Sequence, residues 1–114
     1  MGELVSAEFG NIALAAGGTY SSKPRPVLIF QNSAFSTGES TVVIPFTSEE
    51  NPDIYYRVPV SATNGNGLGR DCWLEIDKVS AIRTSWLGPT IGKLEMGPLT
   101  QAVELSRQLM SPSV

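Results

Sequence analysis

Two short segments of the chain place chemically useful side chains at the ends of apolar runs. In Lys23-Pro24-Arg25-Pro26, a guanidinium comes immediately before an apolar run, and two prolines hold the backbone extended, which fixes the direction of Arg25. In Ile44-Pro45-Phe46-Thr47-Ser48, two hydroxyls stand just beyond the end of the next apolar run. Strand ends on a rigid sheet hold catalytic groups in fixed positions. The fixed cation and the two hydroxyls are therefore candidate catalytic groups.

Each segment also has a structural interpretation. Arg25 could pair with Glu49 or Glu50, and Thr47 and Ser48 could shape a turn, because surface ion pairs and turn hydroxyls are both common. Composition and spacing leave both interpretations open.

The rest of the sequence excludes several other kinds of site. The chain has no histidine, which removes imidazole acid–base pairs, the serine and cysteine triads that use histidine, and most zinc sites. The carboxylates are scattered without metal-ligand spacing, so we expect neither a metal ion nor another cofactor. Cys72, the single cysteine, lies in an apolar run and is predicted to be a buried core residue. The run from Asn64 to Gly69 is superficially similar to a phosphate-binding loop, but a strand follows it and not a helix, so we interpret it as a turn.

The spacing of apolar and turn-forming residues predicts six or seven short strands and then one helix. The predicted strands are Leu4 to Phe9, Pro26 to Phe30, Thr41 to Ile44, Tyr55 to Val60, Cys72 to Ile76, Val79 to Ile82 and Ile91 to Leu94. The stretch from Asn11 to Lys23 is predicted to be a long loop, Pro45 to end a strand, and Gly88-Pro89 to be a turn. Pro59 indicates an edge strand, because proline cannot donate to a ladder. Helical spacing from Leu99 to Met110, between Pro98 and Pro112, predicts a C-terminal helix.

Composition bounds the class of protein. Residues 1–114 suffice for one core and are predicted to form a single domain. Hydrophobic residues make up 41% and charged residues 17%, and 11 glycines and 8 prolines imply many turns, which favours a mainly β fold. Because the net charge is −3, any binding of nucleic acid must depend on a local cationic patch. The N-terminus lacks the basic segment of a signal peptide and no apolar run reaches membrane-spanning length, so we expect a soluble cytoplasmic protein.

The order of several motifs resembles that of the MazF/PemK family over almost the whole chain. Gly2-Glu3-Leu4-Val5 is similar to the family's Gly-Asp-hydrophobic start, and Arg25-Pro26-Val27-Leu28-Ile29 to its Arg-Pro-hydrophobic strand. Gln31-Asn32-Ser33 is close to its Gln-Asn-Asp segment, and Val43 to Ser48 matches its hydrophobic-Pro-x-Thr-Ser/Thr strand end. Gly92-Lys93-Leu94 leads into the terminal helix, as in the family. The motifs are short, but they occur in the family's order and with its order of elements.

The resemblance implies a fold, an activity and partners. The fold is mainly β with a C-terminal helix, an SH3-like small β-barrel. The activity is that of a toxin of a type II toxin–antitoxin system, a metal-independent endoribonuclease that cuts single-stranded RNA such as mRNA at a short sequence. Attack by the neighbouring 2′-OH leaves a 2′,3′-cyclic phosphate and a 5′-OH. The resemblance also implies a homodimer and a MazE-like antitoxin whose disordered tail lies in the RNA groove.

The resemblance also assigns roles to residues. The family's essential arginine corresponds to Arg25 and its essential threonine to Thr47. A guanidinium can stabilise the charge on the phosphorane or donate to the leaving 5′-oxygen, and a hydroxyl can bind a non-bridging oxygen or orient the 2′-OH. RNA-binding roles are predicted for Tyr20, Lys23, Gln31, Asn32, Ser48 and Lys78. Tyr20 would stack on a base, and Lys23, Lys78 and Arg70 would contact phosphates.

Two segments depart from the family pattern. Many members carry Gly-Ser-Glu-Gln where this chain has Gly17 to Ser22, and Lys78 replaces the glutamine of a later strand. Both regions contact RNA in the family, so the cleavage sequence cannot be carried over from a relative.

Two other functions stay open at this point. A gyrase poison of the CcdB type shares this fold, but its activity depends on a tryptophan at the end of the terminal helix, and residues 109–114 contain none. A catalytically inactive barrel that binds RNA or protein would keep the fold and lose the chemistry.

Overall fold

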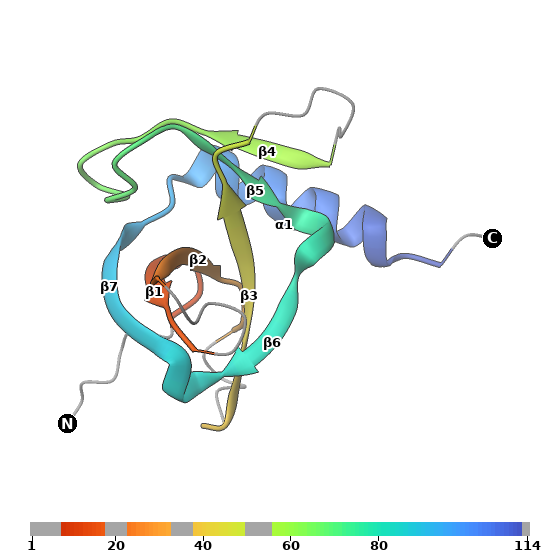
Figure 1. Ribbon diagram of the computed structural model, residues 1–114. Helices are drawn as coiled ribbons and strands as arrows, with labels where there is room; N and C mark the ends of the chain where they lie inside the picture. The colour runs from red at the N-terminus through yellow and green to blue at the C-terminus, as the bar shows by residue number, and fades with distance from the viewer. Residues whose placement is uncertain (1–7, 18–22, 33–37, 50–55, 113–114) are drawn as a thin grey trace.

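The computed structural model describes residues 8–17, 23–32, 38–49 and 56–112. Seven strands and one α-helix follow one another in this part of the chain, with two short 3₁₀ helices between the later strands. The elements are β1 (Asn11–Ala15), β2 (Arg25–Ile29), β3 (Ser40–Thr47), β4 (Arg57–Val60), β5 (Cys72–Glu75), η4 (Ile76–Lys78), β6 (Ser80–Arg83), η5 (Thr84–Trp86), β7 (Leu87–Lys93) and α1 (Met96–Met110). The predicted fold class, mainly β with a C-terminal helix, is confirmed (Figure 1).

The long strand β3 organises the sheet. The strand order is β4-β5-β3-β2-β1-β7, with β6 also paired to β3, and the pairs are antiparallel. One edge of β3 pairs with β2, while the other edge pairs first with β6 and then with β5. The strands curl into a small barrel, and α1 lies outside it, packed against β4 and η4 (Figure 1).

Pro45 does not end β3, contrary to the sequence prediction. The N–H and C=O of Val42 point toward β2. The backbone polar groups of successive residues in a strand point to alternate edges, so the nitrogen of Pro45, three residues later, points to the other edge of β3. On that edge the ladder with β6 ends at Val43 and the ladder with β5 begins at Phe46. Pro45 therefore falls in the gap between two partners, where a missing N–H costs no ladder bond, and the strand continues to Thr47.

The stretch predicted as the first long loop contains a strand instead. Asn11–Ala15 forms β1, between β2 and β7, and Ile12, Ala13 and Ala15 are fully buried. Alanine has a low strand propensity, but small side chains suit a strand that is covered on both faces, and packing outweighs propensity. Phe9, predicted to end a strand, lies in the turn before β1, and residues 4–7 lie outside the described residues.

The predicted turn at Gly88-Pro89 lies within β7. In the described part of the chain β7 pairs only with β1 and so forms an edge. Ala13 pairs with Thr90 but Ala15 with Leu87, so β7 carries one extra residue there, a bulge. An edge strand with a bulge tolerates a proline in its interior.

Alternating strand residues build two hydrophobic clusters. In β2, Leu28 belongs to the larger cluster, and Val27 and Ile29 belong to the smaller one. The helix α1 packs Leu99, Ala102 and Leu105 against the larger cluster. The buried members of the larger cluster are Ile12, Leu28, Ile44, Phe46, Val58, Val60, Cys72, Leu74, Ile76, Leu94 and Ala102.

The C-terminal helix begins slightly earlier than predicted. Glu95 is its N-cap, so Pro98 lies in the first turn, where backbone N–H groups have no intrahelical acceptor. No helix in the described part of the chain combines the length and the apolar character that crossing a membrane requires.

Candidate functional site

The register of β2 and β3 brings Arg25 and Thr47 together. Val27 pairs with Pro45 in this antiparallel ladder. The ladder ends there, and Arg25 and Thr47 lie two residues beyond this last pair, one on each strand, so they belong to the same face because side chains alternate with a period of two. Arg25 is exposed and Thr47 is half-buried, and both line one cleft with a volume of about 600 Å³. The two residues predicted to be catalytic thus share a site.

The cleft is more positive than the protein as a whole. Its described lining includes three basic side chains, those of Lys23, Arg25 and Arg70, and one acidic side chain, that of Glu49. The whole chain, in contrast, has a net charge of −3. Ser48 adds a second hydroxyl, and the remaining lining residues are Pro26, Phe46, Leu68 and Cys72. The cleft therefore offers the local cationic patch that an acidic protein needs to bind a phosphate backbone.

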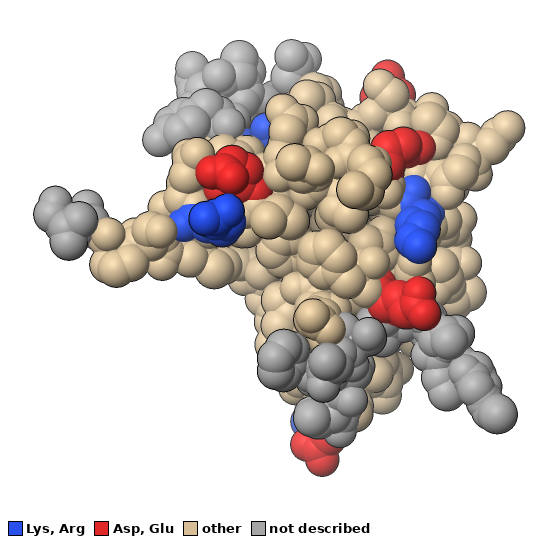
Figure 2. Space-filling view, turned by 180° about the vertical axis from the view of Figure 1, so that it is seen from behind, with Lys and Arg blue, Asp and Glu red and all other residues tan. Residues whose placement is uncertain are grey.

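Figure 2 views the molecule from behind, and the basic side chains that it shows are few and separate, two of them with acidic side chains beside them. Elsewhere on the described surface, Arg107 Nη1 lies 3.8 Å from Glu104 Oε1 on α1. A cation that lies beside an anion attracts a polyanion weakly, so the cleft is the better candidate for binding one.

The connection between β4 and β5 carries Leu68 and Arg70 into the cleft, and a buried asparagine shapes it. Asn66 is fully buried, and its Oδ1 accepts hydrogen bonds from the N–H groups of Thr63 (3.0 Å) and Leu68 (3.1 Å). Its Nδ2 donates to the Ser61 carbonyl (2.9 Å) and to Glu95 Oε1 (3.0 Å). The predicted turn in the run from Asn64 to Gly69 is confirmed, with the turn itself at residues 64–66. Two N–H groups around this turn are bonded to Asn66 and are not available to a phosphate.

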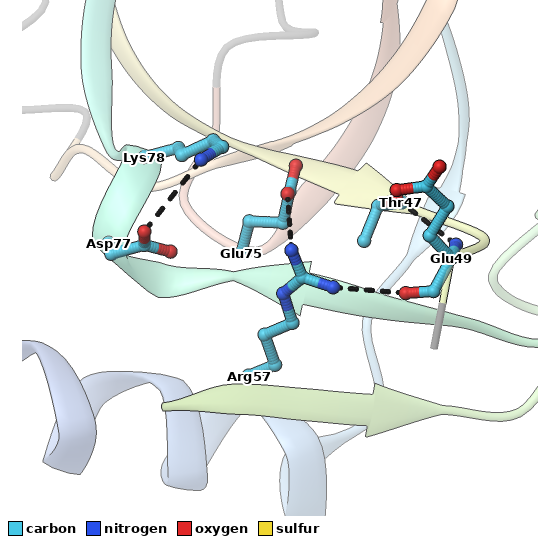
Figure 3. A network of polar contacts seen from close by, with 6 residues as sticks. All are labelled: Thr47, Glu49, Arg57, Glu75, Asp77 and Lys78. Atoms are coloured by element: carbon cyan, nitrogen blue, oxygen red, sulfur yellow. Dashed lines mark hydrogen bonds and ion pairs between the residues drawn. The ribbon is translucent and has the colours of Figure 1, made fainter. Parts of the chain in front are cut away.

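The Thr47 hydroxyl also has a structural role. Its Oγ1 accepts a hydrogen bond from the Glu49 N–H at 3.1 Å, which closes a small turn at the end of β3 (Figure 3). The sequence had left this turn role open as an alternative to catalysis. Because the oxygen is the acceptor, the hydroxyl proton can still be donated toward the cleft. Among the described residues Arg25 forms no ion pair, so the alternative pairing with Glu49 is not observed.

Sequence reasoning missed Arg57, which ties this turn to the neighbouring strands. Arg57 Nη1 donates to the Glu49 carbonyl at 2.9 Å, and Nη2 lies 3.1 Å from Glu75 Oε2 (Figure 3). In the sequence, Arg57 stands out only as a charged residue in the alternating run that ends at Val60. Nothing in that run indicates that its partners are Glu75 in β5 and the carbonyl of Glu49 after β3.

The other predicted RNA-binding residues have different positions. Lys23 and Ser48 line the cleft and are exposed. Arg25 begins β2, whereas Gln31 and Asn32 come after its other end and do not line the cleft. Gln31 Oε1 accepts a hydrogen bond from the Val42 N–H at 3.0 Å. Lys78 lies in η4 outside the lining residues, with Nζ 3.8 Å from Asp77 Oδ2. Tyr20 lies outside the described residues. RNA binding by these residues stays a prediction.

Cys72 forms part of the cleft wall and is not a candidate nucleophile. The residue is buried, as predicted. Burial, reinforced by the negative charge of Asp71, raises the pKa of the Cys72 thiol to about 11. A thiol is nucleophilic as the thiolate, which this environment suppresses at neutral pH.

Comparisons with known proteins show the family of this chain and agree with its fold. Residues 1–109 match the family model described as PemK-like, MazF-like toxin of type II toxin-antitoxin system. A curated relative, "Probable endoribonuclease MazF" of Mycolicibacterium smegmatis, is 39% identical over 80 residues, which are 70% of this chain and 73% of that protein. The solved structure of Mycobacterium tuberculosis toxin MazF-mt6 is 25% identical, with a TM-score of 0.73 over 91% of this chain and 99% of that chain. A MazE-MazF structure from Deinococcus radiodurans, 16% identical, has the same fold, with a TM-score of 0.76 over 93% of this chain and 96% of that chain.

Proposed function

The chain belongs to the PemK-like, MazF-like toxins of type II toxin–antitoxin systems and is an endoribonuclease, and from this premise we propose how it acts. It cleaves single-stranded RNA, mRNA in particular, at a short sequence in the cytoplasm, as a single toxin domain and without a metal ion. The neighbouring 2′-OH loses its proton to solvent as its oxygen attacks phosphorus, the bond to the 5′-oxygen breaks, and that oxygen takes up a proton from solvent. The products carry a 2′,3′-cyclic phosphate and a 5′-OH.

The observation that carries this proposal is that Arg25 of β2 and Thr47 of β3 line one cleft, whose described lining has an excess of positive charge. Cleavage by an internal 2′-OH requires in-line geometry and stabilisation of the charge on the phosphorane. The Arg25 guanidinium donates to the non-bridging oxygens or to the leaving 5′-oxygen, because its donors form a fixed fork that suits phosphate. The Thr47 hydroxyl donates to a non-bridging oxygen or orients the 2′-OH.

The other basic residues of the cleft bind the RNA strand around the scissile phosphate. Lys23 precedes β2 and Arg70 precedes β5, so they approach the cleft from different elements. Each neutralises a flanking phosphate, which offsets the acidic charge of the whole chain. Binding should therefore weaken as salt is raised, with a slope that reflects the number of phosphates contacted.

The partners are a second copy of the chain and an antitoxin. The Deinococcus radiodurans structure is named as a MazE-MazF pair, and one mycobacterial structure of the same fold is an endoribonuclease in complex with its cognate antitoxin. By analogy, this chain forms a homodimer and is neutralised by a MazE-like antitoxin whose tail occupies the RNA cleft.

Cleavage of a long single-stranded RNA in the presence of EDTA, followed by sequencing of the fragment ends, tests the proposal. The wild type is expected to cut at discrete sites and to leave 2′,3′-cyclic phosphates. Arg25→Ala and Thr47→Ala are each expected to lower the cleavage rate by about a hundredfold or more, the usual effect of removing a group that stabilises developing charge.

Two exposed residues outside the cleft provide matched controls. Arg83→Ala and Thr90→Ala make the same chemical changes elsewhere and are expected to cleave at the wild-type rate. If the wild type binds RNA but cuts none of a wide range of sequences, the chain is an inactive binding barrel. Damage to gyrase without RNA cleavage would instead indicate a poison of the CcdB type.

A further inference from the structure

A chain of polar contacts runs from the Thr47 hydroxyl to the interior of the sheet. Thr47 Oγ1 accepts the Glu49 N–H, the Glu49 carbonyl accepts from Arg57 Nη1, and Arg57 Nη2 pairs with Glu75 Oε2 (Figure 3). The distances are 3.1, 2.9 and 3.1 Å. The same two residues of the turn, Thr47 and Glu49, line the cleft, whereas Arg57 and Glu75 do not.

The ion pair at the inner end of this chain of contacts is held firmly. Arg57 and Glu75 face each other in the ladder between β4 and β5, and their side chains are only 10% and 12% exposed. Hydrogen bonds that involve charged partners are stronger than neutral ones, and screening by salt is weak away from solvent. The pair therefore fixes the position of the guanidinium relative to two strands.

The guanidinium of Arg57 is held at two points by hydrogen bonds. Its two terminal nitrogens serve different partners, and its Nε is buried without a hydrogen-bond partner in the described part of the chain. A planar fork can bind two acceptors in fixed directions, whereas an ammonium is a single point charge on a flexible stem. Arg57 therefore joins Glu75 and the Glu49 carbonyl through two separate nitrogens whose directions are fixed relative to each other.

We propose that Arg57 is a positioning residue for RNA cleavage: anchored by Glu75, it holds the Thr47–Glu49 turn so that the Thr47 hydroxyl stays in the cleft that Arg25 also lines. This inference rests on the proposed function. Because Arg57 does not line the cleft, it acts through the Glu49 backbone and does not touch RNA. Small displacements of a catalytic group reduce the rate strongly while leaving ground-state binding intact.

The substitution Arg57→Lys tests this role, because lysine keeps a positive charge beside Glu75 but lacks the second terminal nitrogen, which donates to the Glu49 carbonyl. Single-turnover cleavage at saturating RNA is expected to slow about tenfold, while the affinity for a 2′-O-methyl RNA that cannot be cleaved changes less than about twofold. Hydrogen exchange of the Glu49 amide, followed by NMR, is expected to accelerate, because this amide donates to Thr47 Oγ1.

Arg107→Lys is the matched control. Arg107 is also within 4 Å of a glutamate, but it lies on the surface of α1. This variant is expected to match the wild type in cleavage, analogue binding and Glu49 exchange. If Arg57→Lys fails to fold, Glu75→Gln takes its place, because it keeps an acceptor for Nη2 and removes the charge that anchors the guanidinium. It is expected to give a loss of rate in the same direction, about threefold, with faster Glu49 exchange.

The outcomes separate this inference from the proposed function. A wild type that cleaves no RNA overturns both. A wild type that cleaves, with an Arg57→Lys rate that is unchanged, overturns the positioning role alone. A loss of analogue binding, or a slower rate without faster Glu49 exchange, also overturns it, since Arg57 would then act on RNA or elsewhere in the protein.

Discussion

Replacing Asn66 by alanine should destabilise this protein more than its place in a surface turn would suggest. The side chain is fully buried and makes four hydrogen bonds, two from backbone N–H groups, one to a backbone carbonyl and one to the Glu95 carboxylate. Alanine removes all of them and leaves the backbone groups around the turn without their partners. The turn also packs closely on β7, since a Cβ on Gly92 would overlap the Asn66 carbonyl carbon.

The expected loss follows from these contacts. A neutral hydrogen bond contributes about 1 kcal/mol to stability and one to a charged group about 2 kcal/mol, which gives about 5 kcal/mol for the set. Water can reach part of the space left by the side chain, and neighbouring effects do not add fully. We therefore expect Asn66→Ala to lower the free energy of unfolding by about 3–4 kcal/mol, a large share of the roughly 5–15 kcal/mol typical of a domain.

Urea unfolding followed by tryptophan fluorescence measures this loss, because Trp73 and Trp86 are both partly buried. Asn64→Ala is the matched control, since Asn64 is exposed in the same turn, and its effect should stay within about 0.5 kcal/mol. Both variants should be compared at one protein concentration, because association would shift the midpoint. If the two variants differ by less than about 1 kcal/mol, the hydrogen bonds of Asn66 do not stabilise the turn as argued.

Three further predictions concern titration. The Thr63 hydroxyl and the Asn66 amide donate to Glu95 and lower its pKa, so Glu95 stabilises the fold above the unfolded-state pKa. This contribution should fade as the pH falls below the ordinary glutamate value of 4.5, and Glu95→Gln should remove that part of the acid dependence in urea titrations. Because burial raises the pKa of Cys72 to about 11, its thiol should react with iodoacetamide at pH 8 about a hundredfold more slowly than it does in urea. Equal rates would contradict its burial. The chain has no histidine, so the cleavage rate should vary little between about pH 6 and 8, and a sharp bell-shaped profile would refute a mechanism of positioning and electrostatics.

Much of the fold could be predicted because its signals are local. The apolar runs at β2 and β3, the turn at Asn64 and the period of α1 each depend on neighbouring residues only. The failures came where tertiary context overrides a local rule. Pro45 stays within β3 because two partner strands leave a gap beside it, and Asn11–Ala15 forms a strand because its small residues are enclosed by the sheet.

The sequence by itself determined the identity of the candidate catalytic pair. Arg25 and Thr47 follow from the motifs around them, and the sequence also excluded mechanisms that require histidine. Only the tertiary structure decided which distant residues hold the segments around this pair and which further basic residues enter the cleft. Arg70 enters the cleft through a turn that Asn66 fixes to Glu95, 29 residues away. Arg57 pairs with Glu75, 18 residues away, and donates to the carbonyl of Glu49 in the turn that Thr47 closes. A buried polar group must find a partner, but which distant residue provides it depends on how the strands cross, and that information has no local pattern in the chain.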